Sequence, residues 1–163
     1  MTAVVRAATP ADLDELARMG AALAKMHHEL DPARFLYGDG FVDGYRRWFA
    51  QELDRAEVCF RVVDRGEGAR GVAGYVYGRL EGKDWNHLLD EHAALVDLFV
   101  AEDARHHGAG EALLRAFCAW ADEQSAARVV LSTATQNVTA QRLFARFGFR
   151  PTMVEMTRER GGR

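Results

Sequence analysis

The stretch DLFVAEDARHHGAGE, residues 97–111, decides the fold expected for this 163-residue chain. It begins with apolar residues typical of a strand, passes through a segment with two glycines, and leads into residues 109–125, whose apolar side chains recur at helical spacing. The start of a helix exposes unpaired backbone N–H groups and a partial positive charge, and glycine lets an anion approach these groups closely. The stretch therefore predicts a strand-loop-helix unit that suits a phosphate-bearing ligand.

Upstream of this stretch, the spacing of apolar residues predicts two helices and four strands. Steps of three and four residues indicate helices over residues 10–28 and 42–54. Alternating apolar residues predict strands over residues 3–7, 58–62, 72–79 and 94–101. A glycine-containing turn at residues 64–68 makes the middle two strands a hairpin, and the charged segment 80–92 is expected to form an exposed loop.

Downstream of the glycine-led helix, the pattern alternates between strands and a helix. An apolar strand is predicted over residues 128–133, then a helix over residues 139–147 that Gly148 closes, then a last strand over residues 152–157. Antiparallel strands followed by strand-helix units indicate an α/β (α+β) fold. We expect a single domain over residues 3–160, with a mixed, mostly antiparallel β-sheet flanked by helices on both faces.

Composition excludes several classes of protein. With 48% hydrophobic residues and a formal net charge of -3, the chain is an ordinary globular protein that lacks the basic excess of a nucleic-acid-binding domain. Its N-terminus has no apolar segment typical of a signal peptide, and no run approaches the roughly 18 apolar residues of a membrane span. We expect a cytoplasmic protein with no nucleic-acid or membrane partner. Cys59 and Cys118 have apolar neighbours and are expected to be reduced core thiols.

The glycines of the deciding stretch do not complete either common nucleotide motif. No Gly-Lys-Ser/Thr is present, so the loop is not a Walker motif, and the GxGxxG pattern of dinucleotide-binding proteins is incomplete at Leu113. A glycine pair before a helix also occurs as a plain structural turn. Further residues are therefore needed to decide between a turn and a ligand site.

Two blocks of sequence supply that evidence. Arg105-x-x-Gly108-x-Gly110 follows Val100 by five residues, and it resembles the acetyl-CoA motif of the GNAT superfamily of N-acetyltransferases. A second block is similar to that family's strand, asparagine and helix, and it contains Leu131 to Asn137, Ala140, Leu143-Phe144 and Gly148-Phe149. The opening residues 5–13 also resemble a GNAT first strand and helix. The resemblance covers nearly the whole chain and implies an enzyme that transfers acetyl from acetyl-CoA to an amine acceptor.

The resemblance assigns a binding role to the residues of the first block. Backbone N–H groups of seven consecutive residues would hold the pyrophosphate: Arg105, His106, His107, Gly108, Ala109, Gly110 and Glu111. Main-chain groups of Leu98, Phe99 and Val100 would pair with the amide-rich pantetheine arm, as an added strand pairs with a sheet edge. One N–H there would also hold the developing oxyanion. His106 and His107 are expected to donate to phosphate or face solvent, and no metal site is predicted.

In the second block, the resemblance places Asn137 and Ala140 against the other side of the pantetheine arm and Phe144 near the thioester sulfur. Many GNAT enzymes carry a tyrosine at this last position that protonates the departing thiolate, and phenylalanine has no proton to give. Since a thiol of pKa about 8.5 leaves passably as an anion, this departure weakens the enzyme hypothesis only modestly.

Asp97 is the candidate general base. An amine is mostly protonated at neutral pH and must lose a proton before it attacks a thioester. The run Asp-Leu-Phe-Val resembles the Asp-Phe-Phe-Val of diamine acetyltransferases, although Val96 stands where those enzymes have a glutamate, which puts a polyamine substrate in doubt. Another GNAT branch uses a glutamate where this chain has Ser132. The competing interpretation is that Asp97 merely pairs with a helix or loop partner.

The acceptor stays open at this stage. His27 and His28 end the first helix, where GNAT proteins often build part of the acceptor pocket, but they are also ordinary helix-end residues. A small-molecule amine is favoured over a protein or peptide amine, and a non-catalytic acyl-CoA-binding domain is the remaining alternative. Family habit and the aromatic stripe of Tyr45, Trp48 and Phe49, which suits core or dimer packing, raise a homodimer as a hypothesis.

Overall fold

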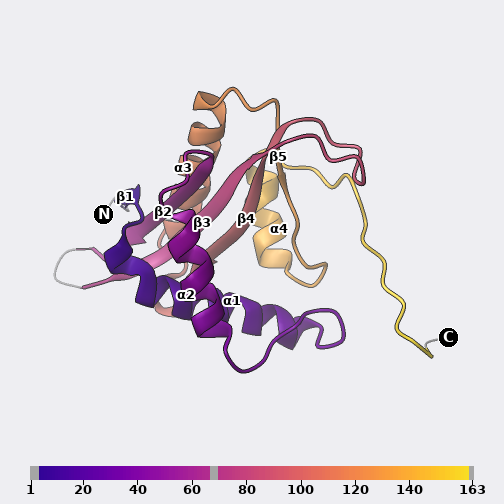
Figure 1. The fold of residues 1–163 in the computed structure, drawn as a ribbon, viewed down its shortest axis with the longest axis horizontal. Helices are drawn as coiled ribbons and strands as arrows, with labels where there is room; N and C mark the ends of the chain where they lie inside the picture. The colour runs from indigo at the N-terminus through magenta and orange to yellow at the C-terminus, as the bar shows by residue number, and fades with distance from the viewer. Residues whose placement is uncertain (1–3, 67–69, 162–163) are drawn as a thin grey trace.

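A computed structural model describes residues 4–66 and 70–161, and its centre is one five-stranded sheet (Figure 1). The strands are β1 (Val5–Ala7), β2 (Val58–Asp64), β3 (Val72–Glu81), β4 (His92–Val100) and β5 (Val129–Leu131). They lie in the order β1-β2-β3-β4-β5; the first four pair antiparallel, and β5 pairs parallel with β4. The predicted mixed, mostly antiparallel sheet is confirmed.

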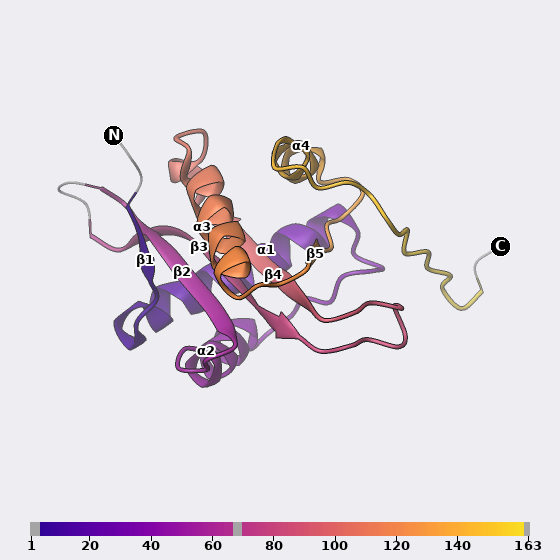
Figure 2. The ribbon, with the colours of Figure 1, turned by 90° about the horizontal axis from the view of Figure 1, so that it is seen from above.

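Helices cover both faces of this sheet. The helices are α1 (Leu13–Leu30), α2 (Phe41–Glu52), α3 (Ala109–Glu123) and α4 (Val138–Arg146). α1 and α2 pack on one face, while α3 and α4 contribute to the cluster on the other, and Figure 2 shows α2 and α3 on opposite sides of the strands. Among the described residues, none of the helices combines the length and apolar character needed to cross a membrane.

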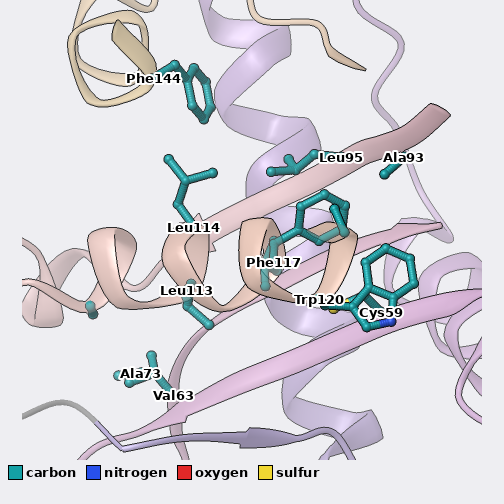
Figure 3. Packing of buried hydrophobic residues seen from close by; sticks show 13 residues of the cluster. Cys59, Val63, Ala73, Ala93, Leu95, Leu113, Leu114, Phe117, Trp120 and Phe144 are labelled. Atoms are coloured by element: carbon teal, nitrogen blue, oxygen red, sulfur yellow. The ribbon is translucent and has the colours of Figure 1, made fainter. Parts of the chain in front are cut away.

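The core under α3 is mostly aliphatic. Leu113, Leu114 and Phe117 are fully buried and point from α3 to the sheet (Figure 3). Gly78 on β3 allows this close packing, because a Cβ there would lie 2.4 Å from the Phe117 ring. Cys59 is free and fully buried in the same cluster, and burial raises the pKa of its thiol to about 11. It is therefore an inert core residue, as its apolar neighbours predict.

The core under α1 and α2 is aromatic instead. Phe49 of α2 meets Phe60 of β2 edge to face, with ring centroids 4.9 Å apart, and Tyr75 and Tyr77 of β3 complete the cluster. Such pairs add roughly 0.5–1.5 kcal/mol each to the hydrophobic term. The predicted helical aromatic stripe thus supplies core packing through Phe49, whereas its neighbour Trp48 is only half-buried.

An irregularity in β4 divides the strand into two parts. Tyr77 pairs with Asp97 but the next residue of β3, Gly78, pairs with Leu95, so Val96 is an extra, bulged residue. The bulge sends Asp97 to the α1/α2 face and Leu95 to the α3 face, although an unbroken strand would place both on one face. β5 pairs only with Ala93 to Leu95, so within the described residues the later part of β4 has no strand partner on that side.

Several predicted boundaries need correction. The last strand predicted over residues 152–157 is wrong: residues 150–161 are exposed and contain no strand. Apolar alternation shows that a segment fits a sheet, but a strand also needs a neighbour for its backbone hydrogen bonds, and this segment lies beside none. The strand predicted over 128–133 is only Val129–Leu131 for the same reason. Ala3, in the first predicted strand and domain, and residues 67–68 of the predicted turn lie outside the described residues.

The remaining elements follow the sequence pattern closely. β3 and β4 extend to Glu81 and His92, so the exposed loop is shorter than the predicted segment 80–92. Trp85 and Leu88 in this loop are 82% and 86% exposed. The helices predicted over 10–28, 42–54, 109–125 and 139–147 are each displaced by a few residues at most, since helix ends are fixed by local capping that spacing alone does not locate.

Candidate functional site

The first turn of α3 forms an anion cradle. Gly108 is its N-cap residue with a φ of +82°, a backbone conformation that favours glycine, and the loop residue His106 also has a positive φ of +66°. Gly108 O accepts from Ala112 N, so by helix geometry the N–H groups of Ala109, Gly110 and Glu111 have no partner within the helix. The loop from Arg105 to Gly108 is exposed, which leaves these donors accessible. The predicted strand-loop-helix unit is therefore confirmed, and its free donors have a geometry that suits a phosphate group.

Arg105 fastens this loop to the end of β4. Its Nε donates to the carbonyl oxygen of Val100 at 3.0 Å, and its guanidinium carbon lies 5.9 Å from the centre of the Phe99 ring. On the other side, Asp103 accepts from Arg65 Nη1 at 2.6 Å, which ties the loop to the end of the β2–β3 hairpin. Both contacts hold the cradle against the sheet, so its donors keep a fixed position relative to β4.

The open edge of β4 lies next to the cradle. Leu98, Phe99 and Val100 belong to the part of β4 that pairs with β3 on one side and, within the described residues, with no strand on the other. Backbone groups along such an edge accept an extended, amide-rich ligand as if it were another strand. The geometry thus brings together the loop residues 105–111 and the strand residues 98–100, which sequence analysis assigned to one ligand.

The three site residues predicted from the second block, Asn137, Ala140 and Phe144, have structural contacts of their own. Asn137 caps α4, because its Oδ1 accepts from the backbone N–H of Ala140 at 3.2 Å. Phe144 is 7% exposed and packs on Phe149 within the cluster under α3, where Figure 3 shows it above Leu114. Asn137 and Ala140 therefore form a rigid helix start, and Phe144 is a core residue.

Asp97 is a buried carboxylate at the bulge. Asp97 is 8% exposed, and its Oδ2 accepts a hydrogen bond from the hydroxyl of Tyr75 at 3.1 Å. Burial raises the pKa of Asp97 to about 6, although the Tyr75 hydrogen bond and the nearby His27 each lower it. Its hydrogen-bond partner lies on the neighbouring strand, so the helix or loop partner considered from the sequence is not what holds it.

Three side chains lie around Asp97 for which the sequence predicted no definite role in the site. They come from three elements: His27 from α1, Tyr45 from α2 and Tyr75 from β3. Burial, followed by the charge of Asp97, raises the pKa of both tyrosines. His27 Nδ1 lies 2.9 Å from the carbonyl oxygen of Leu23, which only accepts, so Nδ1 carries a proton. No sequence spacing joins these residues, because the bulge and the helix packing bring them together.

Two hollows are lined by residues of the elements that carry this group. One, of about 520 Å³, lies between α1 and the end of β4, and its lining includes Met19, Met26, Phe99 and Arg105. The other, of about 420 Å³, lies at the start of α2, and its lining includes Asp39, Phe41, Tyr45 and Trp48. The first reaches the end of β4 through Phe99 and the loop before α3 through Arg105. The second has an acidic and aromatic wall that suits a cationic group.

A family model described as acetyltransferase (GNAT) family matches residues 23–149. An uncharacterized N-acetyltransferase of Bacillus subtilis (strain 168), YobR, is 33% identical over 64 residues, which are 39% of this chain and 26% of that protein. This alignment therefore spans about a quarter of that relative's length.

Solved structures share the fold over nearly the full chain. A tetramutant of the BH1408 protein from Bacillus halodurans has a TM-score of 0.81 at 18% identity, with 96% of this chain and 99% of that chain covered. The aminoglycoside N-acetyltransferase AAC(6')-Iy, solved in complex with CoA, has a TM-score of 0.71 at 15% identity, with 98% of this chain and 95% of that chain covered. At these identities the likeness establishes the fold alone.

Proposed function

Because this chain belongs to the acetyltransferase (GNAT) family, as the resemblance in its sequence predicts, we propose that it transfers the acetyl group of acetyl-CoA to a primary amine of a small molecule. The transfer is a direct attack within a ternary complex of enzyme, donor and acceptor. The observation that carries this proposal is the position of Asp97, a buried carboxylate with a raised pKa at the bulge where the open edge of β4 begins.

The donor site consists of residues whose geometry suits acetyl-CoA. The free N–H groups at the start of α3 and the φ of Gly108 fit a pyrophosphate, and the unpaired edge of β4 fits the amide-rich pantetheine arm. We assign the donor contacts to Leu98, Phe99, Val100, Arg105, His106, His107, Gly108, Ala109, Gly110, Glu111, Asn137, Ala140 and Phe144. When bound, acetyl-CoA supplies a thioester carbonyl as the electrophile.

Asp97 is the base in this proposal. A carboxylate of pKa about 6 is mostly ionised at pH 7 and is a stronger proton acceptor than one of ordinary pKa. The proton of the amine passes to Asp97, directly or through water, while the nitrogen lone pair forms a bond to the thioester carbon. Tyr75 holds the carboxylate in place through its hydroxyl. The acid-base role therefore belongs to a side chain that β3 orients and the bulge positions.

Departure of the thiol needs no acid from Phe144. The carbon–sulfur bond breaks as the carbonyl re-forms, and CoA leaves as a thiolate because its thiol is acidic enough to depart as an anion. The proton that Asp97 took from the amine then passes through solvent to the thiolate. An N–H of the open edge of β4 supports the negative charge that develops on the carbonyl oxygen. Phe144 is buried in the core, so the contact that we assign to it with the donor is an apolar one.

The hollow at the start of α2 supports a cationic small molecule as the acceptor. Its wall combines the carboxylate of Asp39 with the rings of Trp48 and Tyr45, and Tyr45 connects it to Asp97. A ring face and a carboxylate together attract an ammonium group. The neighbour AAC(6')-Iy is named for an aminoglycoside, which belongs to this class of polycationic amine. We therefore propose that a compound with several amino groups fits better than one with a single amine.

The experiment that tests this function measures CoA release with a thiol reagent across polyamines, aminoglycosides, amino acids and short peptides. Asp97→Asn is compared with the wild type and with Asp54→Asn, an exposed aspartate beyond α2, as the matched control. We expect turnover to fall about a hundredfold or more in Asp97→Asn alone, while acetyl-CoA still binds. Full turnover in Asp97→Asn would contradict the role of Asp97. Silence across the panel with acetyl-CoA bound would favour a protein acceptor or a non-catalytic domain.

A further inference from the structure

The middle of α1 contains a glycine that helix formation does not explain. Gly20 is buried within this helix, between Met19 and Ala21, which are also buried. Glycine weakens a helix interior relative to alanine, because it loses more backbone freedom when the chain folds. The local sequence therefore gives no reason for a glycine at this position, and the reason has to lie in what packs against it.

The ring of Tyr45 packs directly on Gly20, where α2 crosses α1 (Figure 1). A Cβ at Gly20 would lie 2.7 Å from both Cε1 and Cγ of this ring, and closer still to Cδ1, although Cβ contacts below 3.0 Å essentially never occur. The ring has little room to yield, because it also packs on Phe49 and Trp48, with ring centroids 5.2 Å and 5.7 Å apart. A side chain at position 20 would therefore push Tyr45 out of its place.

The same ring borders the surroundings of Asp97. Tyr45 and Tyr75 both pack on Phe49, with ring centroids 5.2 Å and 5.6 Å from it. The hydroxyl of Tyr75 donates to Oδ2 of Asp97 at 3.1 Å. Burial raises the pKa of Tyr45, and the charge of Asp97 raises it further. A packed series of side chains therefore leads from α1 and α2 to the carboxylate on β4.

Two oxygen atoms in this series remain accessible. Every buried side-chain nitrogen and oxygen of the described residues has a hydrogen-bond partner. Within that part of the chain Oδ1 of Asp97 and the hydroxyl of Tyr45 have none, so neither atom is sealed from solvent. Tyr45 also lines the hollow at the start of α2, together with Asp39 and Trp48. A ligand in this hollow thus contacts a residue whose hydroxyl has free hydrogen-bonding capacity near a carboxylate.

We propose that Tyr45 is an acceptor-binding residue that presents the amine to Asp97, and that Gly20 is the positioning residue that admits its ring. This role rests on the proposed function and adds the side chain that orients the attacking nitrogen. The hydroxyl oxygen of Tyr45 accepts a hydrogen bond from one N–H of the amine, while Oδ1 of Asp97 takes the proton of another. The hydroxyl keeps its own hydrogen, because burial and the charge of Asp97 raise its pKa.

The first test separates binding of the acceptor from binding of the donor. The probe is the amine of the panel with the highest turnover, and Tyr45→Phe keeps the ring but removes the hydroxyl. Since the hydrogen bond is present before and during the attack, we expect KM for this amine to rise about tenfold, while kcat and the dissociation constant of acetyl-CoA change less than about twofold.

Tyr77→Phe is the matched control for this test. It removes a hydroxyl of the same aromatic cluster that donates to Glu52 instead, so KM for the amine should not change. An unchanged KM in Tyr45→Phe would overturn the role of Tyr45 and leave the proposed function standing. A wild type that turns over no amine of the panel would overturn both.

The second test asks whether Gly20 acts through that hydroxyl. Gly20→Ala is made in the wild type and in Tyr45→Phe, with Gly82→Ala, at an exposed position in open space, as the control. We expect Gly20→Ala to raise KM for the amine about tenfold in the wild type and to leave it unchanged in Tyr45→Phe, which has no hydroxyl to displace. An equal rise in both backgrounds would show that Gly20 supports general packing only, and would overturn its positioning role.

Thermal melts test the contact between the two residues. Gly20→Ala should lower the melting temperature of the wild type and of Tyr45→Phe by about 5 °C, because the ring remains in both and an overpacked core costs stability. In Tyr45→Ala the ring is absent, so Gly20→Ala should raise the melting temperature by about 3 °C, as alanine favours a helix interior. A fall in Tyr45→Ala as well would show that the ring is not the reason for the glycine, and would overturn this part of the proposal.

Discussion

The two faces of the sheet differ in what they bury. Under α3 the described core is apolar, built from residues such as Leu113, Leu114 and Phe117. Under α1 and α2 it is aromatic and contains two buried carboxylates, Glu52 and Asp97, each bonded to a tyrosine of β3. An apolar face stabilises the fold, whereas buried acids cost stability and are retained where they have a further role.

The two carboxylates differ in how their negative charge is balanced by neighbouring groups. Glu52 accepts from Tyr77 at 2.6 Å and forms an ion pair with Arg55 at 3.0 Å, so its charge is balanced. Within the described residues Asp97 has a tyrosine hydroxyl and His27 nearby, but no ion pair with lysine or arginine. Glu52 therefore has the contacts of a structural acid, whereas the weaker compensation of Asp97 is consistent with the proton-transfer role proposed for it.

The largest effect should follow from breaking the apolar face. Phe117→Ala removes a fully buried ring that contacts Gly78 and leaves a cavity, so we expect a loss of about 4 kcal/mol in the free energy of unfolding. Urea denaturation measures it, with Val138→Ala, an exposed position at the start of α4, as the control. A loss below about 1 kcal/mol would show that the residues around position 117 close the cavity, so that the packing on this face is not rigid.

Replacing Asp97, in contrast, should raise the free energy of unfolding. Its folded-state pKa of about 6 lies above the unfolded value of 3.8, so the folded protein holds a proton more tightly between these pH values and stability falls as pH rises through them. Asp97→Asn removes this penalty, and it should raise the free energy of unfolding by about 2–3 kcal/mol at pH 8 and by little at pH 3. Denaturation curves at several pH values check it. An equal effect at both pH values would mean that the charge of Asp97 is not the cause.

Removing one tyrosine hydroxyl at a time tests the contacts of Asp97 and Glu52 separately. Tyr75→Phe removes the hydroxyl that donates to Asp97, and Tyr77→Phe leaves Glu52 with Arg55 as its remaining donor, so each variant should lower stability by about 1–3 kcal/mol. The Tyr75 hydrogen bond lowers the pKa of Asp97, so Tyr75→Phe should also move the acidic limb of the kcat/KM profile to higher pH. Tyr77→Phe should leave that limb in place. A shift in both variants would show that the two pairs are coupled.

The smallest effect concerns the two glycines at the start of α3. Gly108 has a positive φ, so Gly108→Ala should cost about 1 kcal/mol of stability and weaken acetyl-CoA binding through the strained cradle. At Gly110 a Cβ would meet only ordinary contacts at 3.6 Å, from Leu143 and Val100, so Gly110→Ala should leave stability unchanged or slightly raised. Thermal melts and titration with acetyl-CoA measure both effects. Equal losses of stability and of acetyl-CoA binding in the two variants would show that the positive φ of Gly108 has no special role.

Local patterns predicted most of the framework. Helical spacing predicted α1, α2, α3 and α4, and alternation predicted the four antiparallel strands, because both signals depend on which neighbours within a few residues share a face. The segment 152–157 shows where this fails: its apolar alternation is that of a strand, but pairing depends on a partner that is distant in the chain or lies in another molecule.

The site divides in the same way. The sequence by itself determined the anion cradle, since the loop, Gly108 and the first turn of α3 are consecutive residues whose backbone geometry is local. Only the tertiary structure decided the surroundings of Asp97: one bulged residue, Val96, turns its side chain toward α1 and α2, and the packing of those helices brings His27 and Tyr45 beside it. A bulge leaves no trace in apolar spacing, and burial, which raises the pKa of this acid, comes from elements far away in the chain.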